Sequence, residues 1–169
     1  ALDEAQAERH FHILTDTLQA AGYVHYEISN FGKPGFFSLN NTAYWIGKPY
    51  LGIGPSAHSF YNDKRGWNIA NNSRYIQSIE QGVVPAEIEE LSKRDRYNEY
   101  IMTGLRTIWG VSPIEIEHRF GESYKGYFLS KAATYLESGE LIRKEEKITA
   151  SPSGKFLIDG IAADLFRIE

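Results

Sequence analysis

The sequence of 169 residues contains no cysteine. This absence excludes disulfides, thiolate metal sites and ligation of an iron–sulfur cluster by these residues. The five histidines do not replace the missing thiolates, because no pair of them has the spacing of metal ligands on one helix face. We therefore predict no metal site within the chain.

Methionine and long apolar runs are also scarce. Met102 is the only methionine, which favours a chain that is part of a longer protein. No apolar run reaches the length that spans a bilayer, and no signal-peptide pattern opens the chain. The formal net charge of −4 leaves no basic surplus to attract nucleic acid or an anionic membrane. The expectation is a soluble, cytoplasmic protein without a transmembrane segment.

The first half of the chain alternates between helical and extended patterns around an irregular, aromatic-rich middle. Apolar spacing predicts a helix over residues 7–21, and alternation predicts a strand over residues 23–31. A helix followed directly by a strand is typical of an α/β repeat. Another helix is predicted over residues 71–82. Composition and periodicity change just after it, so we predict a first domain over residues 1–84.

Residues 85–169 are predicted to form a second domain. Ser92 and Ser112 each precede a helical pattern and suit the N-cap position. A third helix is predicted around residues 124–138. The remaining elements are a β-hairpin over residues 141–149 and a last helix with three apolar residues on one face, Leu157, Ile161 and Leu165. Three helices, a hairpin and a helix describe a winged-helix-like domain, and the fold class is α+β with an α/β first part.

A winged helix often binds DNA, but the charge of this domain argues against nucleic acid as a partner. Residues 86–169 contain twelve Lys or Arg and fifteen Asp or Glu, a net charge of −3. The predicted recognition helix offers only Lys125 and Lys131 as cations. Phosphate contacts dominate the affinity for nucleic acid, and an acidic domain lacks them. A non-enzymatic interaction module remains the alternative from another functional class.

A glycine-rich stretch, Gly52 to Ala57, matches the dinucleotide-binding fingerprint with alanine in the last position. The match is weak, because a fingerprint loop follows a long apolar strand and opens a helix, and neither pattern is present here. Glycines still let the backbone approach a ligand closely and offer main-chain donors. Contact with a ligand and a tightly packed turn are both open interpretations. His58 follows the loop directly and is the histidine of most interest.

Aromatic and amide side chains gather in the middle of the sequence. The cluster comprises Asn40, Asn41, Tyr44, Trp45, Tyr50, Phe60, Tyr61 and Trp67. Flat rings beside amides could line a slot for a planar ligand such as a tetrapyrrole. Large rings also fill ordinary cores, so a packing role is the alternative.

Glu27 and Ser29 fall on one face of the predicted strand, near its carboxyl end. Ligands bind at strand ends in α/β folds. A polar strand face of this kind indicates either contact with a ligand or an edge strand with one solvated face.

Three stretches carry a resemblance to a known family: Tyr26–Gly35, Tyr44–Trp45 and Tyr50–Ser59. Together they closely resemble the heme-chaperone (HemW-like) branch of the oxygen-independent coproporphyrinogen III oxidase-like radical-SAM proteins. The closing stretch, Ile148–Phe166, looks like the end of that family's C-terminal domain. The resemblance spans essentially the whole chain, and the combination of motifs is specific although no single motif is.

The resemblance implies a partial (β/α)₆ barrel, of which this chain holds the last part, followed by the winged-helix-like C-terminal domain of the family. In the parent protein a cysteine triad would hold a [4Fe–4S] cluster, and S-adenosylmethionine would bind its open iron. The present chain lacks those cysteines, so no cofactor and no radical catalysis are expected of it alone. The implied function is the binding of heme and its delivery to a heme-receiving protein. The alternative is that the parent is an enzyme of porphyrin biosynthesis that decarboxylates coproporphyrinogen III.

The resemblance also implies which residues contact ligands, and it implies no catalytic residue in this chain. In the related oxidases a Gly-x-Gly-x-x-Ala stretch lies beside S-adenosylmethionine. The resemblance therefore implies that this cofactor is contacted by Gly52, Gly54, Ala57 and His58. Glu27 joins this cofactor-binding set. In the chaperone branch a His-Asn-x-x-Tyr-Trp motif is linked to heme binding. The resemblance therefore implies heme contact for the matching residues Asn41, Tyr44 and Trp45. Asn40 replaces the histidine of that motif, and His58 or His25 could substitute for it as the ligand.

Overall fold

The computed structural model describes residues 3–168 and divides the chain into two compact units. The first unit combines the residues up to Leu39 with those from Tyr97 onward, and the second unit contains Asn40–Arg96. The predicted domain boundary between residues 84 and 85 concerns the family's architecture and stays a prediction. The compact units divide the chain elsewhere, because the residues just after 85 pair with a strand of the second unit.

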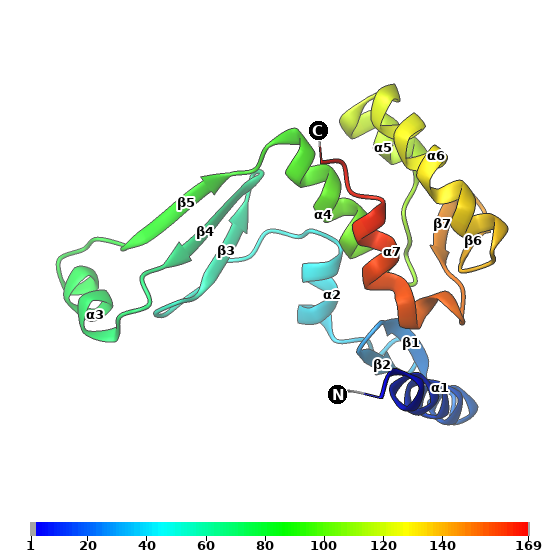
Figure 1. Cartoon of the computed structure of the whole chain (residues 1–169). Coiled ribbons are helices and arrows are strands. Elements are labelled where there is room, and N and C mark those ends of the chain that lie inside the picture. Colours follow the sequence, from blue (N-terminus) through cyan, green and yellow to red (C-terminus); the bar gives the residue numbers. More distant parts are fainter. Residues whose placement is uncertain (1–2, 169) are drawn as a thin grey trace. The chain divides into compact units, whose positions relative to one another are not determined.

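The described residues form helices and short antiparallel strands in an α+β arrangement (Figure 1). The α-helices are α1 (Glu4–Ala20), α2 (Leu39–Trp45), α3 (Asn72–Glu80), α4 (Lys93–Leu105), α5 (Pro113–Phe120), α6 (Glu122–Glu137) and α7 (Ile158–Asp164). The strands are β1 (Val24–Glu27), β2 (Asn30–Gly32), β3 (His58–Tyr61), β4 (Lys64–Asn68), β5 (Ala86–Glu90), β6 (Leu141–Lys144) and β7 (Lys147–Ala150). No helix within residues 3–168 combines the length and apolar content needed to cross a membrane.

The core of the first unit lies in its C-terminal part. Residues from α4, α5, α6, β6, β7 and α7 form one buried apolar cluster that includes Tyr97, Ile101, Phe128, Ile148 and Leu165. Figure 1 shows α5 and α6 lying against each other, with the β6–β7 hairpin beside α6. The predicted order of helices and hairpin is confirmed for this segment.

Side-chain caps fix where two of these helices begin, as predicted. The Ser92 hydroxyl accepts a hydrogen bond from the Asp95 amide at 3.2 Å, and the Asp95 carboxylate accepts one from the Ser92 amide at 3.1 Å. This reciprocal pair is a capping box. The Ser112 hydroxyl accepts a bond from the Glu115 amide at 3.3 Å, and Pro113 occupies the first helical position.

The second unit contains a three-stranded antiparallel sheet in the order β3-β4-β5, together with α3, whose predicted helix is confirmed. Its buried side chains are few: among the described residues of this unit, only Asn68 and Leu91 are buried. Large apolar side chains stand exposed instead, at Leu51, Ile53, Ile76, Val84 and Ile88. This unit therefore has little hydrophobic core of its own.

The strand predicted over residues 23–31 is wrong in one respect, because the chain folds back on itself within it. β1 and β2 are antiparallel partners, with His25 opposite Phe31. The Glu27 carboxylate accepts hydrogen bonds from the Ser29 amide and the Asn30 side-chain amide. These two bonds close a tight turn and prevent one continuous strand.

The helix that Ser92 caps ends at Leu105, because the following backbone pairs with β1. The Ile28 amide donates to the Arg106 carbonyl at 3.1 Å, and the Ile108 amide donates to the Tyr26 carbonyl at 3.1 Å. Residues far apart in sequence thus join β1 to the end of α4. The predicted last helix is also modified, since it opens with a 3₁₀ turn over Gly154–Leu157 and leaves Leu157 49% exposed.

A buried ion pair reinforces this junction. The side chain of Glu27 is 1% exposed, and its carboxylate lies 3.2 Å from the guanidinium of Arg106. Arg106 also pairs with Asp159 at the start of α7, whose side chain is 64% exposed. Removing one member of a buried pair leaves the other charge without compensation, whereas exposed pairs contribute little to stability.

We therefore expect Glu27→Gln to lower the free energy of unfolding by about 3 kcal/mol, whereas Asp159→Asn lowers it by less than about 1 kcal/mol. Both variants remove one carboxylate charge from the same arginine and differ in burial. Urea unfolding followed by circular dichroism measures the two values. Equal losses in the two variants would contradict a structural role for the buried pair.

Candidate functional site

The glycine-rich loop is a tightly bonded turn. The side-chain amide of Asn68, which is buried on β4, donates to the carbonyls of Gly52 at 3.2 Å and Gly54 at 2.9 Å. The Gly52 amide donates to the Ser59 hydroxyl at 2.9 Å, and the Gly54 amide donates to the Tyr75 hydroxyl at 3.2 Å. These backbone groups are therefore already used within the second unit, which favours the packed-turn interpretation.

Glycine is required at this turn for two different reasons. A Cβ atom on Gly52 would lie 2.2 Å from the His58 carbonyl oxygen, so no larger residue fits. Gly54 has a φ of 103°, a conformation that residues with a side chain rarely adopt. Ala57 donates its amide back to the Gly54 carbonyl at 3.3 Å and completes the turn. Contact of this loop with a cofactor stays a prediction.

The predicted aromatic cluster is divided into smaller contacts within the second unit. Tyr44 on α2 meets Tyr50 edge to face, with ring centroids 4.4 Å apart, and Tyr50 lies 6.3 Å from Phe60. On the neighbouring strand pair, the ring of His58 lies 6.4 Å from that of Trp67. Tyr44 is 47% exposed, so the cluster is not a closed core.

The remaining predicted site residues differ in accessibility. Asn41 and Trp45 are partly buried on α2, and His58 is exposed on β3. Glu27 is buried in the first unit. Its carboxylate pairs with Arg106 and accepts hydrogen bonds from Ser29 and Asn30. The structure therefore places Glu27 in a different unit from the other predicted residues. Their roles in ligand contact stay predictions.

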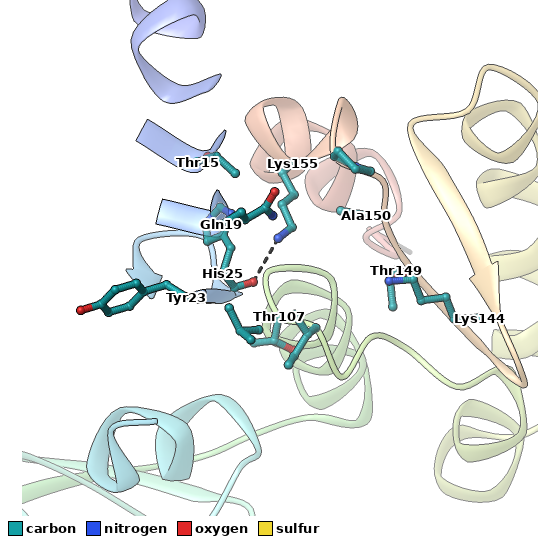
Figure 2. A pocket seen from close by; sticks show the side chains of 12 residues that line it. Thr15, Gln19, Tyr23, His25, Thr107, Lys144, Thr149, Ala150 and Lys155 are labelled. Atoms are coloured by element: carbon teal, nitrogen blue, oxygen red, sulfur yellow. Dashed lines mark hydrogen bonds between the residues drawn. The ribbon is translucent and has the colours of Figure 1, made fainter. Parts of the chain in front are cut away.

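The first unit contains a pocket that sequence reasoning missed (Figure 2). Its volume is about 290 Å³. It is lined by parts of α1, β1, the residues after α4, the β6–β7 hairpin and the segment that follows. The lining residues are Thr15, Gln19, Tyr23, Val24, His25, Thr107, Ile108, Lys144, Thr149, Ala150, Pro152 and Lys155. Its polar groups come from positions separated by more than a hundred residues, so no local motif could have indicated it.

Lys155 is the central cation of this pocket. Its ammonium donates a hydrogen bond to the His25 carbonyl at 3.0 Å, shown as the dashed line in Figure 2. Burial, together with the smaller effect of the like charge of Lys144, lowers the pKa of Lys155 to about 8. The ammonium is thus charged at neutral pH in a position that disfavours charge.

His25 is the most buried polar side chain of the pocket, being 2% exposed. Its ring stacks on Phe31 with centroids 4.2 Å apart, and its Nε2 lies 2.8 Å from the Ile28 carbonyl oxygen. Because a carbonyl only accepts, Nε2 carries the proton in the neutral ring. Desolvation by burial lowers the pKa of His25, which favours that neutral form.

Two buried polar atoms on residues that line the pocket have no hydrogen-bond partner among the described residues. They are Nδ1 of His25 and the hydroxyl oxygen of Thr149, which is 4% exposed. Buried polar groups are normally paired, and exceptions indicate a missing partner. Within residues 3–168 no group of three or more His, Cys, Asp or Glu side chains is placed to hold a metal ion.

Comparison with known proteins gives a consistent result. Residues 91–157 match the HemN C-terminal domain family. Heme chaperone HemW of Bacillus subtilis is 32% identical over 155 residues, which cover 91% of this chain and 41% of that protein. Heme chaperone HemW of Lactococcus lactis is 30% identical over 160 residues, which cover 89% of this chain and 42% of that protein. The chain therefore spans less than half the length of these relatives.

A solved structure shows the same fold. The structure of coproporphyrinogen III oxidase (HemN) from Escherichia coli, described as a radical SAM enzyme, superposes with a TM-score of 0.68. The match covers 92% of this chain and 40% of that chain, at 19% sequence identity. The predicted α+β fold class is confirmed by this match and by the matched HemN C-terminal domain.

Burial of Lys155 predicts a pH-dependent stability. Its folded-state pKa of about 8 lies below the ordinary value of 10.5, so between these values the unfolded chain holds a proton that the folded chain has released. The free energy of unfolding should therefore rise with pH in this window. Urea unfolding between about pH 8 and pH 9.5 should show the rise in the native chain and lose it in Lys155→Met.

The matched control is Lys147→Met, which removes an exposed lysine from the same hairpin. This variant should keep the pH dependence of the native chain. Parallel profiles for the native chain and Lys155→Met would show that the ammonium is not desolvated.

Proposed function

Because the chain belongs to the family that contains HemN and the HemW heme chaperones, we propose that it forms the C-terminal part of a heme chaperone, which binds heme and delivers it to a receiving protein. The observation that carries this proposal is the 32% identity to HemW of Bacillus subtilis over 91% of the chain. The chain spans 41% of that relative, so the activity is proposed for the whole protein.

The proposed parent protein also contains a [4Fe–4S] cluster and S-adenosylmethionine. The HemN structure, described as that of a radical SAM enzyme, supports this assignment. The present chain does not fit the cluster, because it has no cysteine to ligate iron. When bound, the cluster and S-adenosylmethionine would supply radical chemistry, and the cysteine ligands of the cluster must come from residues outside this chain.

In the second unit, we assign cofactor contact to the surface around Gly52, Gly54, Ala57 and His58. Because Ser59 and Tyr75 already accept the amide bonds of the two glycines, the loop has few free donors. Contact would therefore come mainly from side chains that stand exposed around the turn, Leu51, Ile53 and His58. This arrangement suits the apolar and ring surfaces of a ligand better than its phosphate or carboxylate groups.

Heme contact is assigned to the α2 residues Asn41, Tyr44 and Trp45. Asn40 stands where the motif of the chaperone branch has histidine, and an amide is a poor ligand for iron. Of the two histidines that could replace it, His58 is exposed and lies in the same unit as Tyr44, whereas His25 is 2% exposed and engaged through Nε2. These facts favour His58 as the heme ligand.

Coproporphyrinogen III oxidation is the second candidate function. The structural similarity to HemN favours it, whereas the curated sequence relatives favour the chaperone. Assay of the reconstituted full-length protein for protoporphyrinogen production separates the two functions.

Binding of nucleic acid by the winged-helix-like segment has little support. Of the two cations of α6, Lys125 is paired with Glu117 at 2.6 Å and with Glu122 at 3.7 Å. Lys131 is the other cation of α6, and the domain that contains this helix has a net negative charge. The partners proposed for the parent are heme or a porphyrin and a heme-receiving protein. The cytoplasmic location stays a prediction.

Heme titration of the full-length protein, followed by the Soret absorbance, tests the proposed function. We expect saturable binding, and we expect His58→Ala to weaken it by about tenfold or more. The matched control is His118→Ala, which removes an exposed histidine from α5 and should leave the affinity unchanged.

The two parts of this proposal fail separately. A full-length protein that binds no heme would overturn the chaperone function. Normal heme binding by His58→Ala would overturn only the choice of ligand.

A further inference from the structure

The pocket of the first unit has a charge that matches an anion. Lys144 and Lys155 reach into it from different sides, as Figure 2 shows. None of the described residues that line it is acidic. The nearby carboxylate of Glu27 is already paired with Arg106. Two ammonium groups without an acidic neighbour in the lining would attract a negatively charged ligand.

The unpartnered polar atoms specify more than negative charge. The Thr149 hydroxyl can donate to an oxygen atom of the ligand. Because Nε2 of His25 carries the ring proton, Nδ1 is an acceptor and needs a donor from the ligand. A matching ligand therefore presents both a charged oxygen and a hydroxyl group. A singly protonated phosphate has both, whereas sulfate and carboxylate groups have no such hydroxyl.

We propose that this pocket binds a singly protonated phosphate group, with Lys155 and Lys144 facing its charged oxygens, Thr149 donating to one of them and Nδ1 of His25 accepting from its hydroxyl. The pocket volume of about 290 Å³ leaves room beside the phosphate for a small organic group. Val24, Ile108 and Ala150 provide an apolar wall for that group. Inorganic phosphate and a small phosphate monoester share the recognised chemistry.

The site does not depend on the proposed heme function. It uses none of the residues assigned to heme or cofactor contact in the second unit. Failure of heme binding and failure of phosphate binding are therefore distinguishable outcomes.

Isothermal titration calorimetry of the 169-residue chain at about pH 6.5, where phosphate monoesters with a second pKa near 6 are partly protonated, tests the proposal. The probes are inorganic phosphate, glycerol phosphate and sulfate, at ionic strength matched with chloride. We expect saturable binding of the phosphates and at least about tenfold weaker binding of sulfate. Tighter binding of glycerol phosphate identifies an ester as the ligand, and tighter binding of inorganic phosphate identifies the free ion.

Variants connect the binding to the named atoms. Lys155→Met and Thr149→Val should each weaken phosphate binding by about tenfold or more, and Lys147→Met should leave it unchanged. Thr149→Val keeps the shape of the side chain and removes a hydroxyl that has no hydrogen-bond partner. The melting temperature of this variant should therefore not fall. The proposal would be overturned if the chain bound no phosphate, if it bound sulfate as tightly as phosphate, or if Lys155→Met bound phosphate unchanged.

Discussion

The buried carboxylate of Glu27 organises the first unit, because a charge at 1% exposure must have compensating partners. The Ser29 and Asn30 amides provide two of them and bend the chain into the β1–β2 hairpin. Arg106 provides the third from 79 residues away, which requires α4 to end beside β1. The backbone bonds of Ile28 and Ile108 then join the two segments. One buried carboxylate thus lies where a turn, a helix end and a long-range junction meet.

The same junction creates the pocket. It brings His25 on β1 next to Thr107 and Ile108, which follow α4. The β6–β7 hairpin and Lys155 complete the lining from the C-terminal segment, and the ammonium of Lys155 bonds to the His25 carbonyl. A site built in this way retains a desolvated lysine and an unpartnered threonine hydroxyl, both of which cost stability. Groups that reduce stability are expected to persist where a ligand compensates them.

The sequence predicts local structure well where local rules decide it. Ser92 and Ser112 cap their helices as expected, and the α5–α6–hairpin order of the C-terminal segment follows from periodicity. Long-range partners were outside the reach of such rules. Alternation over residues 23–31 is compatible with a straight strand. The strand turns because Ser29 and Asn30 donate to the Glu27 carboxylate, and the partner of that buried charge, Arg106, lies 79 residues away. The family was indicated by motifs from both units, whereas the pocket combines residues from segments more than a hundred positions apart, which no single motif contains.

Native-state hydrogen exchange tests whether β1 and the segment after α4 form one cooperative unit with the core. The amides of Ile28 and Ile108 form the junction, and Ile101 lies in the buried part of α4. All three amides should exchange with free energies within about 1 kcal/mol of one another, since they open together. Rapid exchange of Ile28 and Ile108, while Ile101 stays protected, would contradict this expectation.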